Sequence, residues 1–191
     1  MRAALLLLAG CSILSSPPKP QFHYLTLTAH GGPQSAAPKQ TVALEPIELP
    51  GYLDGVEIVE RKTDDEIEHA PADRWAEPLS AGLARTLAQD LDGALASADV
   101  AVRSRPDATA RVAVNLAVDR FEQVGGQVEL AARWTIRPLA GPARRGAFRD
   151  HVPLAAHSGA TVAAALSGLL GKLSDALAAD VLIALREHPS D

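Results

Sequence analysis

The residue with the clearest chemistry in this sequence is Cys11, its single cysteine. It follows a basic Arg2 and the apolar run Ala3 to Leu8, with small residues at positions 9 and 10. This order is typical of a segment whose cysteine thiol takes a diacylglyceryl thioether before a peptidase cuts on its N-terminal side. We therefore expect residues 1–10 to be a lipoprotein signal peptide and Cys11 to be lipidated. An ordinary secretory signal with an incidental cysteine, or a buried apolar N-terminal segment, are the alternatives.

The residue after the cysteine bears on localisation. Ser12 would be the second residue of the cleaved chain, and in the bacteria whose sorting rule is best known an Asp there retains a lipoprotein in the inner membrane, whereas Ser lets it pass on. We expect an outer-membrane anchor with the domain in the periplasm. The apolar run is far shorter than the ~20 residues that cross a bilayer, so the chain would be anchored and not spanning. Residues 11–21 are Ser/Pro-rich and predict an extended tether.

Other candidate chemistry is sparse. Asp150, His151 and Ser158 lie close in sequence and could be imagined as a hydrolytic triad. Neighbouring residues of a strand point to opposite faces, however, and Ser158 is placed to cap a helix. The sequence therefore predicts no catalytic residue and no enzyme.

Metal and cofactor motifs give the same result. The acidic run Asp64 to Glu66 lacks the alternating ligands and glycine of a calcium loop and is typical of a solvated hairpin turn. The six histidines show no ligand spacing, and no phosphate-binding glycine motif occurs. We expect no metal and no cofactor.

The composition of the chain excludes several classes of partner and ligand. The chain has 191 residues, enough for one ordinary domain, and 18 Lys and Arg against 23 Asp and Glu give a net charge of −5. Without a basic excess, and with 4% aromatic residues, nucleic acid is not an expected partner. One cysteine excludes an intrachain disulfide and a thiolate metal cage.

The elements of the N-terminal half follow from hydrophobic spacing. Apolar residues at helical intervals predict a helix that Asp73 caps and that ends near Ala96, with Trp75 in its apolar stripe. Short strands are predicted at 23–28 and 41–49, with a hairpin of 57–62 and 66–70.

The C-terminal half carries the clearest strand signal. Residues 111–124 and 127–139 alternate in polarity around Gly125-Gly126, which predicts a hairpin, and the phase change of the apolar positions predicts a β-bulge near Asp119-Arg120. Further strands are expected at 147–154 and, weakly, at 100–103. Residues 159–187 predict a helix capped by Ser158.

Together these elements predict an α+β fold: an antiparallel or mixed sheet with two long helices packed on it, forming a single domain over residues 22–188. Trp75 and Trp134 are expected in its core. The C-terminal helix is more apolar than one sheet face requires, which suggests a possible homo-oligomer.

Two segments resemble a known family. Leu49-Pro50-Gly51-Tyr52-Leu53-Asp54 with the strand that follows, and Asp73-Arg74-Trp75-Ala76-Glu77-Pro78-Leu79, are similar to signature segments of the ABC-type transport auxiliary lipoproteins, the PqiC-like lipoproteins. The resemblance extends over about residues 24–185 behind the Cys11 motif. It implies an outer-membrane-anchored accessory subunit that works with an MCE-domain protein and, in many members, an ABC ATPase and permease in intermembrane lipid transport.

The physical role that fits this resemblance is scaffolding, because a tether makes a weak docking contact effectively intramolecular. Tyr52, Leu53 and Asp54 are possible docking residues, and simple packing of this loop onto the domain is the alternative. A structural or regulatory envelope lipoprotein of the peptidoglycan synthase activator type, or a lipid carrier with its own cavity, are the alternative functions.

Overall fold

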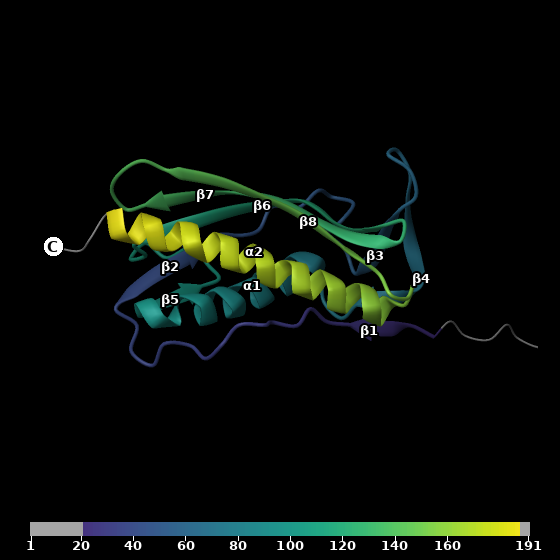
Figure 1. The fold of residues 1–191 in the computed structure, drawn as a ribbon, viewed down its shortest axis with the longest axis horizontal. Helices are drawn as coiled ribbons and strands as arrows, with labels where there is room; N and C mark the ends of the chain where they lie inside the picture. The colour runs from purple at the N-terminus through teal and green to yellow at the C-terminus, as the bar shows by residue number, and fades with distance from the viewer. Residues whose placement is uncertain (1–20, 188–191) are drawn as a thin grey trace, which may run out of the picture.

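The computed structural model describes residues 21–187 (Figure 1). In chain order the elements are β1 (His23–Leu25), β2 (Gln40–Leu44), β3 (Glu57–Arg61), β4 (Ile67–Trp75), α1 (Leu79–Leu95), a 3₁₀ turn (Ala96–Ala98), β5 (Val100–Arg103), β6 (Val112–Val124), β7 (Gln127–Pro138), β8 (Arg144–Pro153) and α2 (Gly159–Glu187). None of the helices within residues 21–187 is both long and apolar enough to span a bilayer.

All eight strands within residues 21–187 belong to one sheet, with β6 at its centre. The first half of β6 pairs in parallel with β2 and its last residues with β3, while its other edge pairs antiparallel with β7, which in turn pairs with β8. Strands β4 and β1 extend the sheet beyond β3, and β5 extends it beyond β2. The predicted α+β single domain is confirmed, and its sheet is mixed.

The two helices lie side by side against one face of the sheet, α2 crossing β6, β7 and β8 (Figure 1). Leu83, Leu87 and Leu91 of α1 are fully buried there, as are Leu169, Leu173 and Leu177 of α2. Because α2 packs against both the sheet and α1, most of its wide apolar stripe is used inside the domain. The opposite face of β6, β7 and β8, which carries no helix, is called the open face below.

The β6–β7 hairpin has the predicted turn and bulge. Gly125 adopts a φ of 58°, in the left-handed region that glycine tolerates. The pairing register shifts between Val118 and Arg120, which places Phe121 opposite Leu130 on the buried face. The extra residue restores the apolar phase, as the sequence pattern required.

The predicted start of α1 is wrong. Asp73 and Trp75 belong to β4, which pairs with β1, and the helix begins at Leu79 after Pro78. The backbone N–H of Trp75 donates to the carbonyl of Val56 (2.6 Å), so it is engaged by the sheet and is not free for a helix. Trp75 continues the leucine spacing by coincidence, and long-range strand pairing overrides that spacing.

Strand bounds also differ from expectation. β2 ends at Leu44 because Pro46 lacks a backbone donor, although Glu48 still bridges to Ala117 of β6. The predicted strand 23–28 is limited to β1, β4 extends past residue 70 to Trp75, and β8 begins at Arg144.

The remaining local expectations hold. The Ser158 hydroxyl oxygen accepts from the backbone N–H of Thr161 (3.2 Å), so it caps α2 as predicted. Trp75 and Trp134 are 4% and 5% exposed and belong to the core, and residues 100–103 form β5.

Candidate functional site

The two residues predicted to be modified or read for sorting, Cys11 and Ser12, lie outside the described residues. The same is true of the signal peptide and nearly all of the tether. The site described below is therefore built from residues of the folded domain.

The predicted docking residues lie in a turn between β2 and β3. The backbone N–H of Leu53 donates to the carbonyl of Pro50, and that of Gly55 donates to the carbonyl of Leu53, both at 2.9 Å. Leu53 is 1% exposed and joins the core, whereas Tyr52 is half-buried and Asp54 is exposed. Leu53 thus fixes the turn, and Asp54 with one side of Tyr52 is what the turn offers to solvent.

Tyr52 is also part of a buried ion cluster formed with Arg61, Arg120 and Glu122. Its hydroxyl oxygen accepts from Arg61 Nη2 (3.3 Å), and that guanidinium lies over the Tyr52 ring, 5.5 Å from its centre. Arg61 Nε and Nη2 donate to the two carboxylate oxygens of Glu122 (2.6 and 3.2 Å), and Arg120 Nη1 donates to one of them (3.0 Å). Glu122 is fully buried, so the bidentate pair and the second arginine replace its lost hydration.

The electrostatics of the buried ion cluster follow from that burial. Desolvation and then the negative charge of Glu122 raise the pKa of Tyr52 above its ordinary value. The hydrogen bond from Arg61 to Glu122 raises the pKa of the guanidinium further above its already high value. The guanidinium is thus held charged and the phenol neutral, an arrangement suited to fixing the turn on the sheet.

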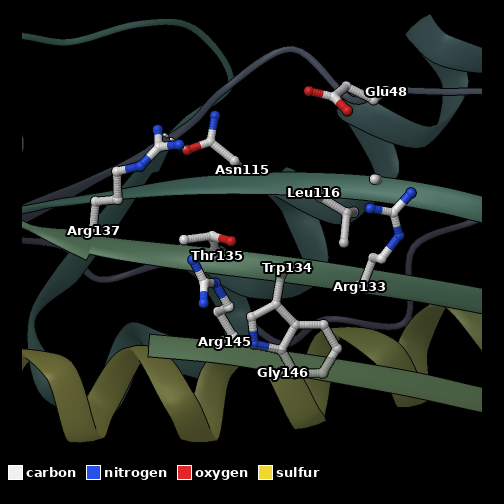
Figure 2. Close-up of a pocket in the computed structure, with 10 residues that line it drawn as sticks. Glu48, Asn115, Leu116, Arg133, Trp134, Thr135, Arg137, Arg145 and Gly146 are labelled. Carbon is white, nitrogen blue, oxygen red and sulfur yellow. Dashed lines mark hydrogen bonds between the residues drawn. The ribbon is translucent and has the colours of Figure 1, made fainter. Parts of the chain in front are cut away.

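A groove lies on the open face, away from the buried ion cluster. It has a volume of about 410 Å³, and its polar lining includes Glu48, Asn115, Arg133, Arg137 and Arg145. Figure 2 shows these side chains together on one side of the strands, with the Trp134 ring near α2. We call it the arginine groove.

Strand register explains why these arginines converge. Asn115 of β6, Thr135 of β7 and Arg145 of β8 are directly paired and form one row across the open face. Arg137 belongs to the row on one side of it and Arg133 to the row on the other side. Rows two residues apart along a strand are about 7 Å apart, so the three arginines alternate between β7 and β8 at that interval.

The three guanidinium groups differ in how they are held. Arg137 Nη1 donates to Asn115 Oδ1 (2.5 Å), and Arg133 Nη2 donates to Asp119 Oδ1 (2.9 Å), which raises the pKa of Arg133. Among the described residues, no hydrogen bond or ion pair engages exposed Arg145. The groove therefore presents one unpaired cation and one held only by a neutral amide.

The floor of the arginine groove is backed by the core. Trp134 Nε1 donates to Asp180 Oδ2 of α2 (2.9 Å), which fixes the indole ring beneath the sheet. Gly146 of β8 lies directly against this ring, where any side chain would overlap it. The floor of the groove is consequently formed by packed strands, and Glu48 of the β2–β3 connection lies at its rim.

The residues considered for hydrolysis serve other purposes. Lys172 Nζ donates to Asp150 Oδ2 (2.7 Å), and Ser158 caps α2. The structure does not assemble Asp150, His151 and Ser158 into a triad. Within residues 21–187, no group of three His, Cys, Asp or Glu side chains is placed to hold a metal ion.

Sequence reasoning missed both clusters. Arg133 and Arg137 fall on the polar face of the alternating strand predicted at 127–139, but Arg145 joins them only through the β7–β8 register. Glu122 has the local context of an exposed strand residue, and its burial depends on Arg61 and Tyr52, about 60 and 70 residues earlier. An alternating strand with arginines on its polar face was the one available signal.

Comparison with solved structures supports the fold. A crystal structure described as that of an uncharacterized protein matches with a TM-score of 0.73 and 21% identity, covering 84% of this chain and 99% of the other. A Xanthomonas campestris protein assigned to family DUF330 matches with a TM-score of 0.67 and 19% identity, covering 85% and 96%. At these identities the likeness shows the fold alone. No match was found among the curated proteins.

Family membership rests on the sequence itself. Residues 24–178 match the family described as the ABC-type transport auxiliary lipoprotein component. The matched region begins within β1, includes both signature segments, the buried ion cluster and the arginine groove, and ends within α2. The chain therefore belongs to the ABC-type transport auxiliary lipoprotein family.

Proposed function

We propose that this protein is an outer-membrane-anchored periplasmic lipoprotein that serves as an accessory subunit of an MCE/ABC-type intermembrane lipid transport system. The observation that carries this proposal is the family match over residues 24–178 behind the Leu8-Ala9-Gly10-Cys11 motif. The lipid on Cys11 would fix the domain to one membrane, and the domain would hold the end of a transport assembly that is rooted in the other.

The energetics of such an anchor favour permanence. Each acyl CH₂ buried in a bilayer contributes about 0.8 kcal/mol, so two or three long chains on Cys11 retain the protein on the membrane. Removing residues 1–10 takes Arg2 with them and makes the net charge −6, from 17 basic and 23 acidic residues. Electrostatic attraction to anionic lipid would not replace the covalent anchor at this charge.

The anchor is tested in a strain that lacks the gene and is complemented with variants. Cys11→Ala is expected to leave the protein unprocessed or mislocalised and unable to restore the envelope barrier against detergent. Ser12→Asp is expected to move it to the inner-membrane fraction, whereas the matched control Ser15→Asp adds the same charge and leaves it in the outer membrane. Full complementation by Cys11→Ala together with outer-membrane fractionation would contradict the proposal.

The turn between β2 and β3 is the proposed contact with the transport partner. Asp54 is exposed, Tyr52 is half-buried, and Leu53 holds the turn in the core. A photo-crosslinking amino acid at position 54 is expected to capture an MCE-domain protein in intact cells. The same probe at exposed position 65, in the loop between β3 and β4, is the control. Equal capture from the two positions, or none from position 54, would count against docking by the turn.

The same cells separate the alternative functions. If crosslinks lead instead to a peptidoglycan synthase, the protein is an envelope regulator. If lipid copurifies in fixed proportion with the protein after the anchor's own acyl chains are accounted for, it is a carrier. The accessory-subunit proposal predicts neither result.

A further inference from the structure

The arginine groove remains unexplained by anchoring or by the turn. It is formed by strands β6, β7 and β8 on the open face, and its three arginines lie in a chain whose net charge is −5. We propose that the groove binds an extended segment of a partner protein in which Asp or Glu recurs at every second residue.

The spacing of the guanidinium groups selects this ligand. Arg137, Arg145 and Arg133 occupy successive rows of the sheet, about 7 Å apart along the strands. In an extended peptide, side chains two residues apart point the same way and are separated by the same distance. A carboxylate at every second position would therefore meet one arginine after another.

The N–H donors that each arginine has free determine how much it contributes to binding the peptide. Arg145 is unpaired within the described residues, so its fork of N–H donors is free for a bidentate carboxylate. Arg137 is positioned by Asn115 and carries no counter-charge there, which makes it the second contact. Arg133 is already paired with Asp119 and contributes least, because the carboxylate of Asp119 offsets its charge.

The lining favours a peptide over a lipid headgroup. Side chains on the open face between the arginines are small or polar, namely Ala117, Thr135 and Ala147 along with Asn115. They make a shallow floor for a backbone and give acyl chains no apolar wall. A single phosphate would engage one or two of the arginines and leave the regular spacing unused.

Glu48 provides a test of whether the ligand of the groove is negatively charged. Its carboxylate is exposed at the rim of the groove, and its negative charge acts on Arg133. An acidic ligand would be repelled by Glu48 and attracted by Arg145. Neutralising these two residues should therefore change the affinity in opposite directions.

The binding experiment uses the full chain purified in neutral detergent at low ionic strength. The probe is a labelled octapeptide that alternates Thr and Glu, compared with a peptide of the same composition in which the four Glu are consecutive. Fluorescence anisotropy is expected to show tighter binding of the alternating peptide, with affinity falling as salt is added.

Variants then locate the binding. Arg145→Gln is expected to weaken binding of the alternating peptide by up to about fivefold, the upper end of the range for exposed ion pairs, and Glu48→Gln is expected to strengthen it. The matched control is Arg103→Gln, which removes the same charge from the exposed end of β5, outside the groove, and should leave affinity unchanged. These residues are exposed, so the variants are expected to fold.

Several results would overturn the inference. They are absence of peptide binding by the wild-type chain, equal affinity for the two peptides, and an equal loss in Arg103→Gln. A fourth is Arg145-dependent binding of inorganic phosphate or of phosphatidylglycerol vesicles without binding of the alternating peptide, which would make the groove a headgroup site. None of these results depends on the Cys11 anchor or on the identity of the transport system.

Discussion

Arginines on the open face and on the adjoining strand β3 form two groups, which are used differently on either side of the β6 bulge. In the group beyond the bulge, Arg61 and Arg120 surround a carboxylate that is fully buried and that Tyr52 helps to cover. In the other group, Arg137 and Arg145 border an open groove and face no buried acid. The first arrangement is closed and locally neutralised, whereas the second leaves cationic donors available.

The difference shows that residue type alone does not distinguish a structural cluster from a binding surface. A guanidinium paired with a buried carboxylate compensates desolvation, and its removal exposes that cost. A guanidinium in open solvent contributes little to stability, so its removal should leave the free energy of unfolding nearly unchanged. Stability and binding measurements should therefore separate the two groups.

The largest expected effect is loss of the buried carboxylate. Glu122→Ala would leave Arg61 and Arg120 without their shared counter-charge and should lower the free energy of unfolding by about 3–5 kcal/mol. Urea unfolding followed by circular dichroism measures it. A loss below about 1 kcal/mol would mean that water replaces the carboxylate and that this group is not closed.

The second effect concerns the floor of the arginine groove. A Cβ added at Gly146 would overlap the Trp134 ring, so Gly146→Ala should cost about 1–3 kcal/mol in the same unfolding assay. Gly126→Ala is the matched control, because a Cβ there meets nothing within 4 Å. If the two substitutions cost the same, the groove floor is not a packed surface.

A smaller effect is expected from the ion pair nearest the groove. Asp119 and Arg133 side chains are 45% and 67% exposed, so Asp119→Ala should change the free energy of unfolding by at most about 1 kcal/mol. The same substitution frees Arg133 and should strengthen binding of the alternating acidic peptide. Unchanged peptide affinity would mean that Arg133 does not contact the peptide.

The smallest effect appears only in alkaline solution. Burial and Glu122 raise the pKa of Tyr52, so the folded state favours the neutral phenol. This contribution to stability is complete below the ordinary tyrosine pKa of 10.0 and is lost as the pH rises through the folded value. In Tyr24→Phe, which leaves Tyr52 as the single tyrosine, the absorbance titration at 295 nm should have its midpoint above pH 10. A midpoint at or below 10 would contradict the closed cluster.

Much of the fold could be predicted from local pattern. The β6–β7 hairpin, its bulge and the Ser158 cap depend on neighbouring residues in sequence, so alternation and turn chemistry were sufficient. The start of α1 could not be predicted this way, because the backbone around Trp75 is hydrogen-bonded to β1 and to the segment before β3. A helical spacing of apolar residues does not reveal that competition.

The features of the candidate site likewise separate into those that depend on local sequence and those that depend on tertiary structure. The sequence by itself determined the Cys11 motif, the signature segments, the family resemblance and the presence of two helices on a sheet, since each depends on residues close together in the chain. Only the tertiary structure decided that Leu53 is buried, that Glu122 is enclosed by Arg61, and that Arg145 joins Arg133 and Arg137. The physical reason is that burial and charge pairing depend on strand register across the sheet, which brings together residues up to about 70 positions apart.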